Sequence, residues 1–350
     1  MGYIYTKSGK LAKRLYFGAV LLFEGLYYTF KNRVLADGGT FVENELPTIS
    51  QDASLVLTPN AYKAGKLYSA VPNDGTGDFT VDRNSTATYI GQDGLIKTAL
   101  ANEVRIDWST GEAALLVEPQ RTNLIPYSED FSNTIWNLGR VSIVPDTSIT
   151  LDGLNTFTKL ESDDASISLD HRIRIVNELD VSIEYTAYIY VKYEDVKYFY
   201  FREGANNIFS IIDIETNTIT KNAAGHQINL ENFNNSILRI SVTFTTPSSL
   251  VFNGLDFGIT SEASDYVCAI PIGKGFYVWG AQLEQASIAS SYIPTAGVTE
   301  TRLADDISVP TPAGVTAITE TIDGVEQTPI TTIPTTYSLP VGNINKVTML

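Results

Sequence analysis

Apolar residues alternate with polar ones in the middle of this 350-residue chain, and this period of two is the strongest single constraint on its fold. The apolar series comprises Val181, Ile183, Tyr185, Ala187, Ile189 and Val191. Successive side chains of a β-strand point to opposite faces of the sheet, so the series predicts a strand with one face in a core. The outward face is expected to carry Ser182, Glu184, Thr186 and Tyr190.

Composition and further strand patterns extend this prediction to an all-β fold. Charged residues make up only 18% of the chain, whereas aromatic residues reach 11%, a balance typical of half-buried pleated surfaces rather than of helical proteins. Alternating segments separated by turn residues recur at Tyr198 to Arg202, Ile208 to Ile214, Ile237 to Phe244 and Phe276 to Leu283. Strands at this spacing predict a jelly-roll-type β-sandwich over residues 118–300.

The segments on either side of the predicted sandwich differ from it in character. Residues 36–117 are rich in turns and read as an irregular β region, beginning after an N-terminal segment of 35 residues. Residues 301–350 form a proline-punctuated tail with candidate strands at Ile318 to Ile322, Ile330 to Ile333 and Ile344 to Met349. About 50 residues make a marginal core, so we expect this small β tail to pack on the sandwich or to take part in trimer formation.

The N-terminal segment combines an apolar run with positive charge. The run from Leu15 to Phe30 is interrupted by Glu24, lacks a small-residue cleavage site and is shorter than the roughly 20 residues that span a bilayer. We therefore expect a buried structural segment, such as strands packed on a partner, with a targeting or membrane-associated segment as the alternative. Residues 1–33 carry a net charge of +5, which leaves −21 for the rest of the chain, so this segment is predicted to be an anchor that docks on an acidic protein surface.

Several chemistries lack the residues that they need. Cys268 is the only cysteine, and His171 and His226 show no metal-binding spacing, so we predict no disulfide, no metal centre and no cofactor. The net charge of −16 argues against nucleic acid as a partner. Three acidic pairs are expected to lie in solvated loops: Asp163-Asp164, Glu194-Asp195 and Asp305-Asp306. Two other hypotheses for these pairs are a calcium site and the catalytic carboxylates of a glycosidase.

Two motifs bracket the predicted sandwich, E-x-x-R-T-N-L at Glu118 to Leu124 and W-G-A-Q-L-E at Trp279 to Glu284. Arg121 and Glu284 are expected to form a buried ion pair between the first and last strands, and loss of one buried partner would be costly. The remaining large apolar residues near these motifs are expected to share the core of the sandwich: Leu116, Val117, Trp136, Val278, Trp279 and Leu283.

These two motifs resemble the concanavalin-A-like, or carbohydrate-binding-module-like, β-sandwich of bacteriophage virion appendages. The stretch from Asp82 to Trp108 resembles the lead-in to that domain, and Arg33 to Gly39 resembles the start of virion proteins of crAss-like phages. The resemblance implies a structural virion protein without enzymatic activity, on the head exterior as a head fibre subunit or, alternatively, on the tail as a receptor-binding fibre. It implies docking of residues 1–33 on capsid or adaptor proteins and self-association as a homotrimer or a dimer.

A sandwich of this kind implies possible adhesion to host-surface polysaccharide. Exposed aromatic rings stack on sugar rings, and polar side chains bond to the hydroxyl groups. The candidate ligand-binding residues are Tyr193, Tyr198, Tyr200 and Arg202, whose alternative role is simple packing within a strand. A capsular polysaccharide depolymerase is the enzymatic alternative, although the chain shows no repeat of fixed period.

Overall fold

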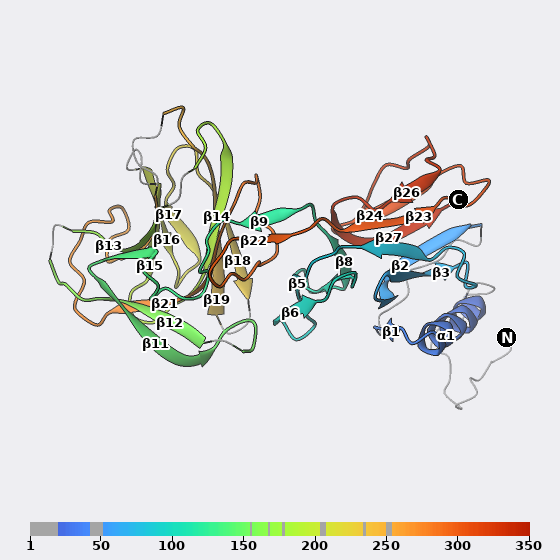
Figure 1. The fold of residues 1–350 in the computed structure, drawn as a ribbon, viewed down its shortest axis with the longest axis horizontal. Helices are drawn as coiled ribbons and strands as arrows, with labels where there is room; N and C mark the ends of the chain where they lie inside the picture. Colours follow the sequence, from blue (N-terminus) through green and yellow to red (C-terminus); the bar gives the residue numbers. More distant parts are fainter. Residues whose placement is uncertain are drawn as a thin grey trace, which may run out of the picture. The chain divides into compact units, whose positions relative to one another are not determined.

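The structure is a computed structural model that describes residues 20–42, 52–154, 156–166, 169–176, 179–203, 208–233, 236–249 and 254–350. The chain divides into two compact units. The terminal unit contains Met1–Asn84, Leu100–Val117 and Asp305–Leu350, and the sandwich unit contains Ser85–Ala99 and Glu118–Ala304. Antiparallel strands dominate the described residues, so the predicted all-β class is confirmed (Figure 1).

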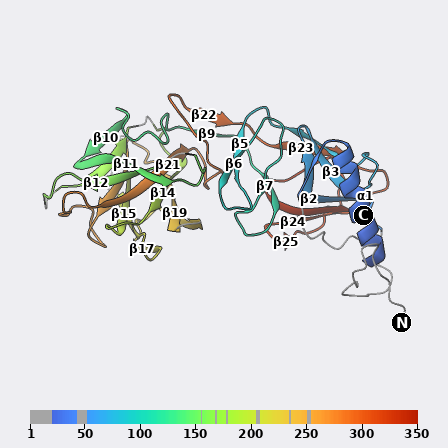
Figure 2. The same ribbon diagram turned by 90° about the horizontal axis from the view of Figure 1, so that it is seen from below.

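Two six-stranded antiparallel sheets form the sandwich unit (Figures 1 and 2). The β13 sheet has the order β10 (Trp136–Gly139), β13 (His171–Ile175), β20 (Leu255–Thr260), β15 (Tyr198–Glu203), β16 (Ile208–Asp213) and β17 (Thr218–Lys221). The β14 sheet has the order β11 (Val141–Ile149), β12 (Thr156–Ser162), β21 (Gly275–Glu284), β14 (Glu184–Lys192), β19 (Ile237–Thr245) and β18 (Gln227–Phe233). All four strands predicted around residues 198–283 are present, within one or two residues of their predicted bounds.

The core of the sandwich lies between the two sheets and uses the predicted face of β14. Tyr185, Ala187, Ile189 and Val191 are buried in this core, whereas Val181 precedes the strand and is exposed. The opposite side chains alternate away from this core, as expected for a strand.

The prediction that the outward face of β14 meets solvent is wrong for Thr186 and Tyr190, which are both buried. A hairpin formed by β5 (Ala87–Ile90) and β6 (Ile96–Ala99) contributes Ile90 and Ile96 to a second apolar cluster on that face. This hairpin belongs to the sandwich unit although its sequence lies in the segment predicted as the turn-rich β region.

The two tryptophans lie in different apolar clusters, although both were expected in the core of the sandwich. Trp136 lies in the core between the sheets, whereas Trp279 packs on the outer face of the β14 sheet with Tyr190 and Tyr292. The centroids of the Trp279 and Tyr292 rings lie 4.8 Å apart. The two tryptophans therefore stabilise different layers.

One large antiparallel sheet organises the terminal unit. Its main path runs through β25 (Val325–Glu326), β24 (Ile318–Ile322), β27 (Gly342–Met349), β2 (Leu55–Lys63), β3 (Lys66–Val71), β4 (Phe79–Asp82), β23 (Asp306–Pro310) and β26 (Thr336–Ser338). Three further strands join its sides: β1 (Thr40–Phe41), β7 (Ile106–Asp107) and β8 (Ala114–Val117).

This sheet differs from the predicted small C-terminal tail. Strands β24 and β27 are at their predicted places, but β27 pairs with β2 and with β8, so the tail shares one sheet and one core with residues 55–117. Residues 330–333 are not a strand, and Ile330 forms only an isolated bridge with Ile318. The predicted placement of Val117 in the sandwich is also wrong, because β8 belongs to the terminal unit, as does Leu116.

A helix, α1 (Val20–Ala36), occupies part of the predicted anchor, where strands were expected. The side chains of Phe30 and Val34 are buried against Ala61 and Tyr68. The amides of residues 37–39 donate to carbonyls of the last helical turn, and Gly38 has a left-handed φ of 73°, which ends the helix. Among the described residues, no helix is both long and apolar enough to cross a membrane. The remainder of the predicted anchor, residues 1–19, lies outside the described residues.

A buried charge cluster links three segments of the terminal unit. Arg83 donates from Nη1 to Oδ1 of Asp305 over 2.7 Å, and Arg105 donates to the other oxygen of the same carboxylate. The side chains of both arginines are fully buried, and that of Asp305 is only 1% exposed. Asp305, predicted to lie in a solvated acidic loop, is therefore the buried counter-charge of two arginines.

Candidate functional site

Charged residues alternate on the outer face of the β13 sheet. Ile173 faces the core between Arg172 and Arg174, so both arginines project from the outer face of β13. The register pairs Arg174 with Asp256 on β20, and Asp256 with Arg202 on β15. Cross-strand neighbours on one face lie close together, so the alternation brings these charges into contact.

Asp256 lies at the centre of this face and is fully buried. Arg174 donates from Nη2 to Oδ2 of Asp256 over 2.8 Å, and Arg202 donates from Nε to the same oxygen over 2.6 Å. Bonds between guanidinium and carboxylate groups are among the stronger hydrogen bonds in proteins. Asp256 therefore fixes the orientation of two arginines from neighbouring strands.

Asp170 connects the same face to two further arginines. Arg172 donates from Nε to Oδ2 of Asp170 over 3.1 Å, and Arg202 donates from Nη2 to this oxygen over 2.9 Å. Arg140 donates to the Asp170 carboxylate and, over 2.7 Å, to its backbone carbonyl. The arginine cluster is defined by Arg140, Asp170, Arg172, Arg174, Arg202 and Asp256.

The arginine cluster carries more positive than negative charge. Four guanidinium groups surround two carboxylates, which gives a net charge of +2 in a chain of net charge −16. Burial works to raise the pKa of Asp170, but Arg172, Arg202 and Arg140 outweigh it and hold the pKa below its ordinary value. The hydrogen bond to Asp256 raises the pKa of Arg174. Near neutral pH, Asp170 is therefore ionised and Arg174 keeps its positive charge.

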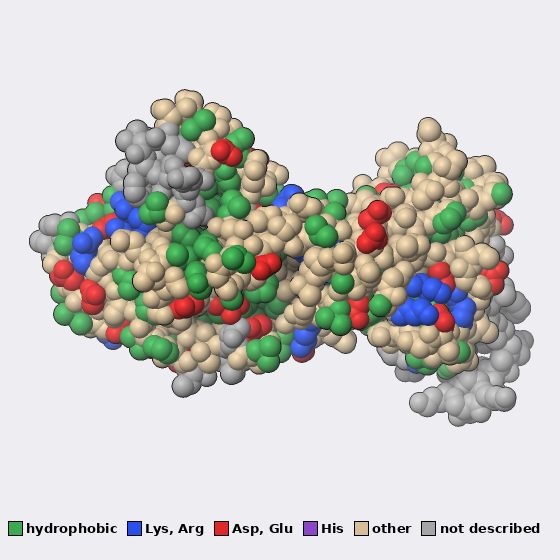
Figure 3. All heavy atoms as spheres, viewed as in Figure 1, with side chains coloured by type: hydrophobic (Ala, Val, Ile, Leu, Met, Phe, Trp, Pro, Cys, Tyr) green, Lys and Arg blue, Asp and Glu red, His purple; other side chains and the backbone are tan. Residues whose placement is uncertain are grey.

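The four arginines are only partly covered. Their side chains are between 11% and 26% exposed, with Arg140 the most accessible. In Figure 3, small patches of Lys and Arg side chains lie close to the place where Figure 1 labels β13, with Asp and Glu side chains near them. A dissolved anion can therefore reach guanidinium edges on this face.

Aromatic rings lie beside the arginine cluster on the same outer face. Tyr200, Ile211 and Tyr266 form a small apolar cluster, against which the half-buried Tyr198 and Phe209 pack. The guanidinium of Arg202 lies 4.5 Å from the centroid of the Tyr266 ring, and the rings of Phe209 and Tyr266 are 4.7 Å apart. Lys221 lies over the ring of Phe209 and Lys197 over that of Tyr198, with Nζ atoms 3.3 Å and 4.9 Å from the ring centroids. The face thus combines cations with aromatic rings that are in part already covered by lysine side chains.

The predicted ligand-binding residues separate into three groups. Tyr198 and Arg202 lie on this face and are partly accessible. Tyr200 shares the face but is fully buried beneath Tyr266, so its ring cannot stack on a ligand. Tyr193 is exposed, but it follows the end of β14 in the other sheet and does not belong to the cluster.

Sequence reasoning missed most of the arginine cluster. Arg172, Arg174 and Asp256 were not predicted as site residues, although the segment HRIRI from His171 to Ile175 alternates arginine with isoleucine. That alternation identifies one charged face of a strand. The pairing of β13 with β20, which brings Asp256 between the arginines, is a long-range contact that sequence alone does not give.

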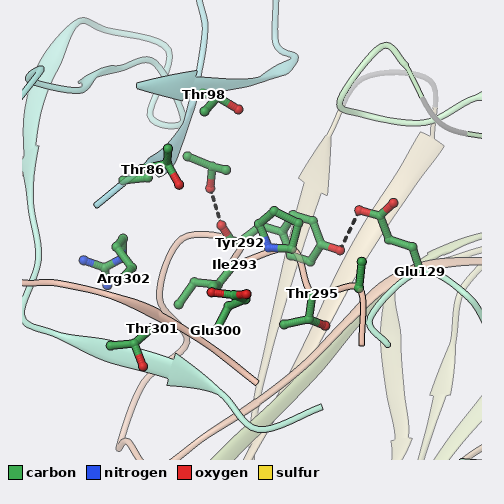
Figure 4. Close-up of a pocket in the computed structure, with 13 residues that line it drawn as sticks. Thr86, Thr98, Glu129, Tyr292, Ile293, Thr295, Glu300, Thr301 and Arg302 are labelled. Atoms are coloured by element: carbon green, nitrogen blue, oxygen red, sulfur yellow. Dashed lines mark hydrogen bonds between the residues drawn. The ribbon is translucent and has the colours of Figure 1, made fainter. Parts of the chain in front are cut away.

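A pocket lies within the sandwich unit, between the β5–β6 hairpin and the segment around Tyr292 (Figure 4). It has a volume of about 450 Å³. Hydroxyl groups, two glutamates and one arginine line much of it: Thr86, Thr88, Thr98, Glu129, Thr295, Glu300, Thr301 and Arg302. The Tyr292 hydroxyl donates to Oε1 of Glu129 over 2.9 Å.

Glu129 and Tyr292 both line this pocket, and burial raises the pKa of both. Burial raises the pKa of Glu129 above its ordinary value, although the hydrogen bond from Tyr292 works in the opposite direction. A carboxyl group of this kind holds its proton to a higher pH than an exposed glutamate. The pocket could therefore offer both a proton and several hydroxyl groups to a bound molecule.

The two bracketing motifs support the sandwich rather than a ligand site. The Asn123 side chain donates to the carbonyl of Ile293 over 2.9 Å and accepts from the amide of Leu283 over 3.2 Å. Gln282 accepts from the amide of Ile293 over 2.7 Å. The motifs thus hold the segment around Ile293 against β21.

The predicted contact between Arg121 and Glu284 is present but long. Nε of Arg121 lies 3.7 Å from Oε2 of Glu284. The glutamate is fully buried and accepts hydrogen bonds from the amide and hydroxyl of Ser290, both at 2.8 Å. The arginine is 22% exposed, and its strand β9 (Arg121–Asn123) pairs with β22 (Glu300–Arg302). Ser290, rather than Arg121, is therefore the main partner of Glu284.

Within the described ranges, no group of three or more His, Cys, Asp or Glu side chains is placed to hold a metal ion. The pair Glu194-Asp195 contacts Lys159 instead, and Asp164 accepts hydrogen bonds from Ser166. At least one member of each acidic pair is therefore engaged with protein groups, Asp305 included.

Comparison with known proteins gives distant structural similarities, among them a phage tailspike domain and a carbohydrate-binding module. No protein-family model matches the chain, and no curated protein matches it. The enzymatically active domain of tailspike protein 4 of bacteriophage CBA120 aligns with 46% of this chain at 10% identity and a TM-score of 0.28, but with only 21% of its own length. The carbohydrate-binding module TmCBM27, described by its specific mannan recognition, aligns with 49% of this chain and 98% of its own length, at 10% identity and a TM-score of 0.28. At this level of similarity, neither comparison assigns a family or a function to the chain.

Proposed function

We propose that this chain is a non-enzymatic virion appendage protein, a head fibre subunit, whose sandwich unit binds saccharides on the outer face of the β13 sheet. The observation that carries the binding role is the arginine cluster beside the half-buried rings of Tyr198 and Phe209. The virion role is supported by the resemblance of the motifs at Glu118 to Leu124 and Trp279 to Glu284 to phage appendage sandwiches.

The chemistry of this face suits a saccharide. Sugar rings present apolar C–H faces and many hydroxyl oxygens, and sugar acids add a carboxylate, so aromatic surface and fixed hydrogen-bond donors recognise them together. The guanidinium groups of the cluster are held by Asp170 and Asp256, so binding requires little ordering of long side chains.

Truncation of Phe209 tests the binding role. We expect Phe209→Ala to weaken saccharide binding by about threefold to tenfold, because an aromatic stack contributes about 0.5–1.5 kcal/mol. The measurement is affinity electrophoresis of the intact protein in gels that contain alginate, polygalacturonate, dextran or pullulan. Phe233→Ala is the matched control, because Phe233 is also half-buried but lies on β18 of the other sheet. If the intact protein binds none of the four polysaccharides, the proposed binding role is contradicted.

The pocket around Glu129 favours hydrolysis as a second candidate function. Glu129 and Glu300 line the same pocket, and the raised pKa of Glu129 suits a general acid. Size analysis of the same four polysaccharides after incubation with the protein separates the two functions. Shortening that disappears in Glu129→Gln would establish a depolymerase, whereas unchanged chain lengths would favour adhesion.

A head fibre subunit must attach to the virion and associate with other copies of itself, and we propose both properties for this chain. Phe30 and Val34 of α1 are buried in the terminal unit, whereas Tyr28 of the same helix is exposed. We propose that residues 1–33 dock on an acidic capsid or adaptor surface, and that the protein assembles as a trimer or, alternatively, as a dimer. Cryo-electron microscopy of the virion would locate the protein and give its copy number.

A further inference from the structure

We propose that the arginine cluster selects acidic saccharides, with the carboxylate of a uronic acid residue bound across the guanidinium edges of Arg140, Arg172 and Arg174. This inference rests on the proposed function, because it names the class of saccharide for the same face. It follows from the charge balance, the accessibility of the cations and the adjacent aromatic surface.

The charge balance is unusual for this molecule. The arginine cluster holds a net charge of +2, while the whole chain carries −16. Asp170 and Asp256 offset part of the repulsion among the four guanidinium groups, and Arg140 also interacts with the nearby Asp164. A further carboxylate would still gain charge-assisted hydrogen bonds from the accessible guanidinium edges. The same logic gives no advantage to a neutral sugar.

The cluster contains a structural part and an accessible part. Asp256 is fully buried and holds Arg174 and Arg202, so this part specifies the packing of three strands. Arg140, the most exposed of the four arginines, and Arg172 share the partly exposed Asp170. The hydrogen bonds to Asp256 described above come from Arg174 and Arg202, so Arg140 and Arg172 are the residues to change in a test.

A saccharide carboxylate fits this face better than a nucleic acid does. A phosphate backbone needs a long basic track, and the strongly acidic chain repels it. The face offers a compact set of guanidinium forks, which match single carboxylates, beside Tyr198 and Phe209 for the attached sugar ring. The aromatic neighbours also distinguish a sugar acid from a simple anion.

The test compares polygalacturonate with carboxyl-reduced polygalacturonate, which keeps the sugar backbone and loses the charge. We expect the intact protein to bind the acidic polymer at least tenfold more tightly than the reduced polymer, by isothermal titration calorimetry at 0.1 M salt. The double variant Arg140→Gln, Arg172→Gln should lose at least 90% of this preference. Lys274→Gln is the matched control, because Lys274 is an exposed cation of the sandwich unit next to β21 of the other sheet. Circular dichroism and thermal melting confirm that each variant is folded.

Three outcomes would overturn the inference, and they also separate it from the proposed function. If the intact protein binds the acidic and the reduced polymer equally, and Phe209→Ala weakens binding of both, the face binds saccharides but does not select acidic ones. Equal binding of poly-L-glutamate and polygalacturonate would reject a sugar site, because the polypeptide supplies carboxylates without sugar rings. A double variant that is folded and retains the full preference for the acidic polymer would show that another surface provides it. If the double variant does not fold, Arg140→Gln and Arg172→Gln are measured separately, and each is expected to lose part of the preference because each removes one positive charge from the cluster.

Discussion

Asp305→Asn should lower the stability of the terminal unit by about 3–5 kcal/mol, the usual cost of removing one partner from a buried ion pair. Arg83 and Arg105 are both fully buried and share the Asp305 carboxylate. Asparagine has nearly the same shape but no charge, so two buried guanidinium groups would lose their common counter-ion. For a unit of this size, the expected decrease in the melting temperature is on the order of 10 °C. Differential scanning calorimetry measures it.

The next residue in the sequence supplies the control for Asp305→Asn. Asp306 is exposed, and it pairs with Asp82 across two strands of the sheet. Asp306→Asn removes the same charge from the same segment but relieves a repulsion between like charges, so the melting temperature should stay constant or rise slightly. Equal melting temperatures for Asp305→Asn and the unmodified protein would show that the buried charge cluster does not stabilise the terminal unit.

Gly275→Ala should destabilise the sandwich unit severely, by more than about 3 kcal/mol, because overpacking of a core typically costs 1–3 kcal/mol even when side chains can adjust. A Cβ atom at position 275 would lie 1.8 Å from the backbone oxygen of Leu160 and 2.8 Å from Cα of Glu161. These are backbone atoms of β12, which pairs with β21 at this point. Relief therefore requires separation of two central strands, and we expect a large loss of soluble, folded protein or a markedly lower unfolding midpoint in urea.

Gly225→Ala distinguishes local backbone strain from this clash. Gly225 has a φ of 91°, and a Cβ atom at position 225 would meet nothing within 4 Å. Alanine there costs only the roughly 1–2 kcal/mol of a left-handed conformation. The urea midpoint should fall less for Gly225→Ala than for Gly275→Ala. The reverse order would mean that β12 and β21 are not packed as closely as the structure indicates.

The strands were predictable from sequence where a local signal determined them. The apolar alternation from Tyr185 to Val191 identifies which side of β14 enters the core, and that prediction is confirmed. The tail strand β24 is likewise predicted at its observed residues, Ile318–Ile322, because the turn at Asp323-Gly324 marks its end. In both cases the information lies within about ten residues of the chain.

Contacts between distant segments were not predictable in the same way. Tyr190 was expected in solvent, but a hairpin almost 100 residues earlier covers it. Strand β27 was assigned to a separate tail, but it pairs with β2, which lies nearly 300 residues earlier. Alternation identifies two faces of a strand, but it does not reveal what covers the second face.

The candidate site was likewise predictable only where residues close together in the sequence form it. Arg202 and Tyr198 are identified from a local cluster of aromatic and basic residues. Tyr200 belongs to that cluster too, but Tyr266 from the segment after β20 buries it. The excess positive charge emerges only when β13, β20 and β15 are neighbours, since Asp256 then separates Arg174 from Arg202. A count of charges along the sequence gives the acidic net charge of the whole chain, but not the local excess of positive charge on this face.

The helix shows how tertiary contacts decide between structures for an apolar segment. The run from Leu15 to Phe30 was expected to form strands, because apolar residues alone do not distinguish a short strand from a buried helix. Phe30 and Val34, four residues apart, lie on one side of α1 and pack on the sheet of the terminal unit. Arg33 adds a hydrogen bond of 3.0 Å to Asp78.

The central claim is that an acidic saccharide binds on the outer face of the β13 sheet, and a crystal structure with tetragalacturonate tests it most directly. We predict a sugar carboxylate within hydrogen-bonding distance of the guanidinium groups of Arg172 or Arg174, with a sugar ring against Tyr198 or Phe209. Saccharide bound only in the pocket around Glu129, or only on the β14 sheet, would contradict the claim, as would an unoccupied β13 face at a saturating concentration of the oligosaccharide.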